Sequence, residues 1–193
     1  MLLIESPDFQ GFLLCQKIRR KTMIQITIAK HATGFPSKVL ARNGGKHIYN
    51  IQLAEAAGKF VDNGWFTAKN AFVALDLYSA KAPTTFAGNI VGKAENGNFY
   101  VEVATPGDAL FIYQTPMIEE TYSNDFKKES NYTNAPTQVV RTYELAAGDI
   151  LEISAEGFSG TVAVGDEVEL KAITGITAAK QLGKKAASNP SGD

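Results

Sequence analysis

Two histidines, His31 and His47, and a single cysteine, Cys15, are the side chains of this sequence that most readily act as bases, nucleophiles or soft metal ligands. Acyl transfer requires a nucleophile beside a base, and a third group must orient that base. The histidines form no His-x-His pair, and there is no second cysteine to complete a zinc site. These residues therefore predict neither a catalytic triad nor a metal site.

Three further segments carry reactive residue types without the spacing that their chemistry requires. Ser159 lies in "GFSG", which lacks the Gly-x-Ser-x-Gly pattern of a nucleophile elbow and falls between predicted strands. The "GGKH" segment places His47 where a phosphate-binding loop needs serine or threonine. The acidic segment 119–129 lacks the alternating oxygens and the turn glycine of a calcium loop. We therefore expect a protein that is not an enzyme and that holds no cofactor or metal.

The remaining acidic residues gather in the segment 148–170, "GDILEISAEGFSGTVAVGDEVEL". Two Gly-Asp pairs predict tight turns, and each is followed by an alternating strand pattern. Glu167 and Glu169 share one face of the second strand, while Val168 and Leu170 share the other. This alternation is typical of a half-buried hairpin whose acidic face is solvated, so the segment is predicted to be a surface rather than an active-site floor.

The elements that hold these residues are predicted to be short β-strands, because apolar and polar residues alternate along most of the chain. The segments with this pattern are "IQITIA", "KHIYNIQL", "AFVALDLYSA", "NFYVEVA", "ALFIYQ", "TQVVRTYEL", "DILEIS", "GTVAV" and "EVELKAI". Helical spacing occurs in one segment, residues 51–61, where Gly58 weakens it. The sequence predicts an all-β protein, a β-sandwich or small β-barrel with at most one short helix.

The pattern divides the chain into three parts. Residues 1–22 fit neither a helix nor a strand and are predicted to be a flexible leader or arm; either Met23 is the natural start or the amino terminus is frayed. Residues 23–179 form the β-rich domain, with a candidate break into two small subdomains near 115–136. Residues 180–193 are small, polar and rich in lysine, which predicts a flexible tail.

Composition narrows the class of partner. The chain has 193 residues with 19 basic and 20 acidic side chains, so a formal net charge of −1 does not favour nucleic-acid binding through a clustered basic face. No apolar stretch reaches the roughly 20 residues that cross a bilayer. The first residues reverse the charge order of a secretory signal. We expect a protein made in the cytoplasm that binds neither nucleic acid nor membrane.

The carboxy-terminal half resembles structural proteins of tailed phages that are encoded near the capsid gene. The resemblance covers residues 122–171 and rests on "ETYSNDFKKESNYTN", "VVRTYELAAGDILEISAEGFSG" and "VAVGDEVEL". Related head proteins carry a Tyr-x-Leu-x-x-Gly-Asp element, an aromatic near a Gly-Phe turn and a closing Val-Gly-Asp hairpin. The corresponding residues here are Tyr143, Leu145, Gly148, Asp149, Phe158 and 164–166.

The resemblance implies a capsid decoration protein, which sits on the assembled virion shell, binds the major capsid protein and stabilises it. Such proteins are often oligomers, and a trimer is favoured. Exposed aromatic side chains commonly carry interface energy. The candidate interface residues are Phe35, Trp65, Phe66, Phe111, Tyr113 and Phe126, for each of which packing in the core is the alternative.

A second hypothesis comes from a different class of protein. β-Sandwich modules that bind carbohydrate stack aromatic platforms on sugar rings, and Trp65, Tyr78 and Tyr100 are the candidates for such a platform here. A tail-associated receptor-binding protein lies between the two hypotheses and shares features of both.

Overall fold

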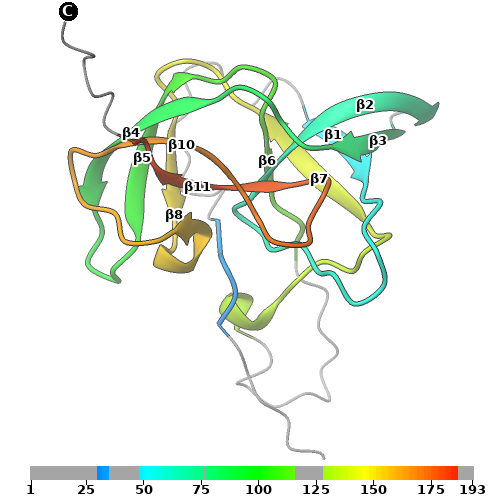
Figure 1. Ribbon diagram of the computed structural model, residues 1–193, viewed down its shortest axis with the longest axis horizontal. Helices are drawn as coiled ribbons and strands as arrows, with labels where there is room; N and C mark the ends of the chain where they lie inside the picture. Colours follow the sequence, from blue (N-terminus) through cyan, green and yellow to red (C-terminus); the bar gives the residue numbers. More distant parts are fainter. Residues whose placement is uncertain (1–29, 35–47, 76, 116–127, 187–193) are drawn as a thin grey trace, which may run out of the picture.

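In the computed structural model, the described residues are 30–34, 48–75, 77–115 and 128–186. Their strands form one highly curved sheet in the order β3-β1-β7-β6-β2-β11-β10-β4-β5-β8, with β9 beside β11 (Figure 1). The strands are β1 Ile48–Gln52, β2 Phe66–Ala74, β3 Leu77–Lys81, β4 Ala87–Lys93, β5 Phe99–Thr105, β6 Leu110–Ile112, β7 Val139–Glu144, β8 Ile150–Ile153, β9 Phe158–Ser159, β10 Glu167–Ala172 and β11 Lys180–Lys184. The only helical elements among the described residues are two short 3₁₀ turns, Glu129–Asn131 and Ala155–Gly157. The prediction of an all-β fold is confirmed.

Five strands close into a barrel. The path β3-β1-β7-β6-β2 returns on itself because β2 also pairs with β3. All of these pairings are antiparallel except that of β1 with β3, which is parallel. Closure pairs both sides of each barrel strand over part of its length, which reduces the exposed sheet edge.

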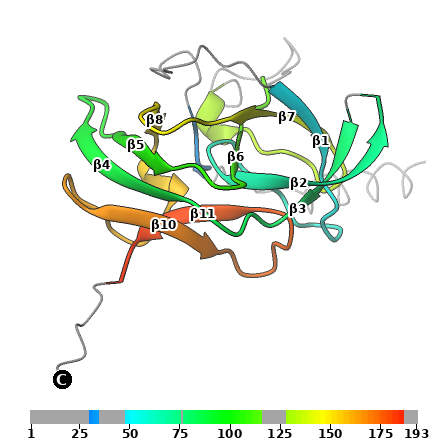
Figure 2. The same ribbon diagram turned by 90° about the horizontal axis from the view of Figure 1, so that it is seen from above.

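The other strands continue the sheet away from the barrel. β11 meets β2 at Lys180 and Phe66, and β10, β4, β5 and β8 follow in order. Seen from above, β10 and β11 lie on one side of the molecule and β8 and β7 on the other (Figure 2). Strands from both sides of segment 115–136 pair directly, β6 with β7 and β5 with β8, so the sheet does not divide there.

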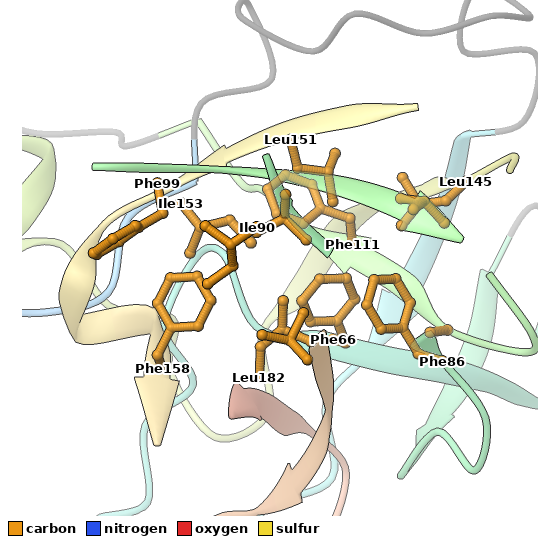
Figure 3. Close-up of a cluster of buried hydrophobic side chains, with 14 of the residues drawn as sticks. Phe66, Phe86, Ile90, Phe99, Phe111, Leu145, Leu151, Ile153, Phe158 and Leu182 are labelled. Carbon is orange, nitrogen blue, oxygen red and sulfur yellow. The ribbon is translucent and has the colours of Figure 1, made fainter. Parts of the chain in front are cut away.

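Two hydrophobic clusters share their strands. Trp65, Leu110 and Ile112 belong to the barrel cluster, while their chain neighbours Phe66 and Phe111 belong to the larger cluster beneath the outer strands (Figure 3). Successive side chains of a strand point to opposite faces, so β6 and the start of β2 fill both cores at once. Continuous runs of buried residues at these positions follow from burial on both faces.

The Gly-Asp pairs form the predicted turns. Gly148 and Gly165 have φ angles of 88° and 93°, a conformation that glycine adopts without a Cβ clash. In each turn the aspartate carboxylate accepts a hydrogen bond from the main chain three residues earlier, at 2.8 Å for Asp149 and 2.9 Å for Asp166. Each turn also exchanges two main-chain hydrogen bonds with a neighbouring strand, at Val103 and at Ile90 respectively. These residues therefore have a structural role.

The helix expected over residues 51–61 is absent. β1 occupies the start of this segment, and the remainder is an irregular loop whose main chain pairs with residues 134–138. The buried carboxylate of Glu55 accepts hydrogen bonds from the main-chain N–H groups of Thr177 and Ala178. These long-range hydrogen bonds replace the local ones of a helix, which the glycine at position 58 already disfavoured.

The flexible tail predicted from residue 180 is not observed over residues 180–186. Residues 180–184 form β11, in which Leu182 is fully buried in the larger cluster. Gly183 is required by close packing, because a Cβ there would lie 2.6 Å from Cγ of Lys171. The lysine-rich composition of this segment concealed a strand that is central to the sheet. The leader, 1–22, and residues 187–193 lie outside the described part of the chain.

Candidate interaction surface

The structure buries three of the predicted interface aromatics. Trp65 is 9% exposed and lies in the barrel cluster. Phe66 and Phe111 are 0% and 1% exposed, with ring centroids 5.7 Å apart in an edge-to-face contact. Phe66 also packs on Phe86, at a centroid distance of 5.0 Å. These rings build the core rather than an exposed interface, and Trp65 does not form an exposed aromatic platform.

Tyr113 lies at the edge of the larger cluster and is half-buried. Its hydroxyl donates a hydrogen bond of 3.1 Å to Oε1 of Glu129. Burial, and then the charge and hydrogen bond of Glu129, raise the pKa of Tyr113 to about 12. The side chain therefore tethers the 3₁₀ turn to the end of β6. Phe35 and Phe126 lie outside the described residues.

The acidic face predicted for segment 148–170 is smaller than expected. Glu152 is fully buried, and its Oε1 accepts hydrogen bonds from Asn96 at 3.1 Å and from Asn98 at 2.8 Å. The loop between β4 and β5 covers this residue, which no local pattern predicts. Glu167 and Glu169 do share the outward face of β10.

A polar network holds residues 30–34 against the barrel. Oδ1 of the buried Asp62 lies 3.0 Å from Nδ1 of His31 and accepts a 2.9 Å hydrogen bond from Thr133. Its Oδ2 accepts a 3.1 Å bond from the main-chain N–H of Ala32. On the other side of this segment, the hydroxyl of Ser154 accepts from the main chain of Thr33. Asp62 thus orients the histidine and anchors the segment.

Neither a metal site nor a membrane-spanning helix is found in the part of the chain that the structure describes. No group of three His, Cys, Asp or Glu residues converges there to hold a metal ion. No helix in these ranges is long and apolar enough to cross a membrane.

The two most exposed large apolar side chains of the described residues, Leu75 and Phe72, lie with Val73 at the end of the β2–β3 hairpin. Leu75 is 86% exposed, Phe72 is 62% exposed and Val73 is 50% exposed. In both ribbon views this hairpin extends to the outer end of the molecule (Figures 1 and 2). We refer to Phe72, Val73 and Leu75 as the hairpin tip. Contiguous exposed apolar residues of this kind are typical of an interaction site.

Aromatic contacts support the hairpin from its barrel side. The ring of Phe72 packs edge-to-face on Tyr78, with centroids 5.7 Å apart, and Tyr78 packs on Tyr49 at 5.9 Å. The ammonium group of Lys69 lies 3.7 Å from the centroid of Tyr49. This series of rings connects Phe72 to the barrel cluster, against which Tyr78 and Tyr49 pack, so the tip is supported from the barrel.

Alternation alone did not separate this hairpin into its two strands. "AFVALDLYSA" reads as one continuous strand, but β2 ends at Ala74 and β3 begins at Leu77. β-Bulges interrupt the pairing of β2 and β3 between Lys69 and Phe72 and again before Ala74. These irregularities end the regular pairing of β2 and β3 near the turn, so alternation alone does not fix the faces of residues 73–75.

Comparisons with protein-family models, with curated proteins and with solved structures find no match to this chain.

Proposed function

We propose that this protein is a virion structural protein that decorates and stabilises a phage capsid by binding the major capsid protein through the hairpin tip. The observation that carries the proposal is the apolar surface of Phe72, Val73 and Leu75, each of which is at least half exposed. Apolar side chains that enter a partner's pocket dominate the binding energy of protein interfaces. The resemblance of residues 122–171 to phage head proteins supplies the identity of the partner.

The architecture suits this role. A closed barrel with two packed cores gives a rigid base, and the hairpin extends from it. Rigid elements lose little conformational entropy when they bind. In a trimer, the oligomer expected from the resemblance, three hairpin tips would engage the shell together and increase the avidity of the complex.

The test uses expanded capsids of the source phage, or of the induced prophage, that lack this protein. The purified full chain is added over a range of concentrations, and bound protein is measured by co-sedimentation. Saturable binding and a higher temperature of capsid disruption are the expected results. A folded protein that shows no saturable binding would overturn the proposal.

The role of the hairpin tip is tested with a triple variant, Phe72→Ser, Val73→Thr and Leu75→Ser. Loss of these contacts is expected to weaken capsid binding at least about thirtyfold. The matched control is Val91→Ser with Val164→Ser, which removes apolar side chains that are 45% and 56% exposed elsewhere on the surface. The control variant is expected to bind as the natural protein does.

A further inference from the structure

The three strands β7, β1 and β3 lie side by side next to the hairpin tip and have two contrasting faces. Their register aligns Arg141, Asn50 and Leu77 in one row, and Val139, Gln52 and Ser79 in the next. The intervening residues, such as Ile51 and Val140, are fully buried inside the barrel. Because side chains alternate across a strand, the two rows lie on the outer face of the barrel.

This outer face carries exposed apolar side chains among its polar ones. Ile48 is 51% exposed and Val139 is 41% exposed, and Leu77 is half-buried between them and the hairpin. The outward side of a one-sided antiparallel sheet normally carries polar residues. The face reaches the hairpin end because Ala74 at the end of β2 pairs with Leu77 at the start of β3; Phe72 instead pairs with Tyr78, which is aligned with the inward-facing Ile51.

Among the described residues, the charged side chains on this face have one sign. Arg141 on β7 and Lys81 at the end of β3 are exposed, and neither forms an ion pair with a described residue. Glu144, the last residue of β7, belongs to the opposite, inward-facing series, together with Thr142. Its carboxylate accepts a 3.0 Å hydrogen bond from the hydroxyl of Tyr49. Unpaired cations beside exposed apolar side chains are complementary to apolar groups bordered by carboxylates.

The hairpin is poorly suited to binding by strand addition. The bulges in β2 interrupt a regular edge, and the hydroxyl of Ser79 bonds both the N–H and the C=O of Ala71, at 3.1 and 3.3 Å. Edge strands that carry bulges resist pairing with another chain. Recognition here is therefore carried by side chains rather than by the main chain.

We propose that the outer face of β7, β1 and β3 and the hairpin tip form a single docking surface for a protein partner whose complementary surface is apolar and bordered by aspartate or glutamate. This inference rests on the proposed function, in which the partner is the major capsid protein. Arg141 and Lys81 orient the complex through its acidic border, while the tip and Ile48 supply the apolar contact.

The test compares two charge reversals, Arg141→Glu and Lys81→Glu, with Lys93→Glu as the matched control of equal charge change on β4. Each of the first two variants is expected to bind capsids about tenfold more weakly at low salt and to lose part of the natural protein's salt sensitivity. Lys93→Glu is expected to bind normally. Arg141→Gln removes the charge without introducing repulsion and should lie between Arg141→Glu and the natural protein; circular dichroism checks the fold of each variant.

The outcomes separate the two proposals. If the natural protein fails to bind capsids, the proposed function is overturned and this inference with it. If it binds while both reversals bind equally well, the docking surface alone is overturned. Vesicles of phosphatidylcholine with 30% phosphatidylglycerol and a short DNA duplex are tested in parallel. If the natural protein binds the vesicles or the DNA, and Arg141→Glu and Lys81→Glu abolish that binding, the proposal of a protein partner is overturned.

Discussion

The β10–β11 hairpin and the β2–β3 hairpin differ in where their side chains find partners. On β10 and β11 each acidic group that faces outward meets a lysine of the same molecule: Asp166 with Lys184 at 2.6 Å, Glu167 with Lys185 at 2.7 Å and Glu169 with Lys171. The apolar side of that hairpin is buried, with Val168 and Leu182 fully inside the larger cluster.

The β2–β3 hairpin leaves its end uncovered. Phe72 packs on Tyr78 along one edge, yet most of its surface is exposed, and Leu75 is more exposed still. A monomer gains nothing in stability from apolar side chains that remain in water. The β10–β11 hairpin therefore finds its partners within the chain, whereas the β2–β3 hairpin leaves apolar side chains exposed to solvent.

The largest expected effect comes from truncating the same residue type in the two hairpins. Leu182→Ala should lower the free energy of unfolding by about 3 kcal/mol, because it leaves a cavity in a fully buried site. Leu75→Ala should change it by less than about 0.5 kcal/mol, since its side chain is exposed. Urea denaturation followed by fluorescence measures both. Equal losses would remove the contrast between the hairpins.

The next effect concerns the connection between β10 and β11. Glu55→Ala removes the acceptor of the Thr177 and Ala178 N–H groups, and leaving the buried Ala178 donor unpaired should cost about 2 kcal/mol. Glu55→Gln keeps one acceptor oxygen and should lose less. Hydrogen exchange of residues 173–179 provides a local readout, and unchanged protection there in Glu55→Ala would contradict this role.

The stability contributed by the segment after β3, where Thr84 and Thr85 bind Asp108, is expected to depend on pH. Burial raises the pKa of Asp108, but hydrogen bonds from the N–H groups of Thr85 at 2.9 Å and Thr84 at 2.8 Å, and from the Thr84 hydroxyl, outweigh it, so the net pKa lies below 3.8.

A lowered folded-state pKa contributes stability that is present above the unfolded-state value and is lost as the pH falls through the folded-state value. Asp108→Asn should therefore be less stable than the natural protein near neutral pH, with the difference shrinking below about pH 4. Thermal unfolding from pH 2 to pH 7 measures this difference. A constant difference across that range would show that the charge of Asp108 is unimportant.

The smallest effect is expected for the outward ion pairs of β10 and β11. The hydrogen bond and charge of Glu167 raise the pKa of Lys185, but both groups are solvated. Exposed pairs are screened by salt, so Lys185→Gln should leave the thermal midpoint unchanged at high salt and lower it only slightly at low salt. Glu167→Gln serves as the reciprocal control. A large loss in either variant would show that this surface stabilises the fold more than its exposure suggests.

Sequence patterns predicted strands and turns correctly where the conformation depends on neighbouring residues in the chain. Alternation predicted most of the strands, and the glycine–aspartate pairs predicted two turns in which glycine alone fits comfortably. The face assignment of Glu167 and Glu169 was also correct, because Val168 opposite them is buried. In each case the neighbours that decide the conformation are adjacent in the sequence.

The candidate site was predicted poorly because exposure is a property of the whole fold. Trp65 and Phe66 resemble surface anchors in the sequence, yet the two faces of their strand contact two separate cores. Closure of the barrel through β2 and β3 leaves the end of their hairpin uncovered, so Phe72, Val73 and Leu75 remain exposed.

The sequence by itself determined an all-β chain, the places of its turns and the alternation of its strands, because these depend on backbone preferences and on periodicity. Tertiary structure alone decided that Glu55 and Glu152 are buried acceptors, that residues 180–184 are a core strand and that the apolar end of one hairpin remains in solvent. Those outcomes depend on contacts between segments far apart in the chain, such as Glu55 with Thr177, and no local pattern encodes them.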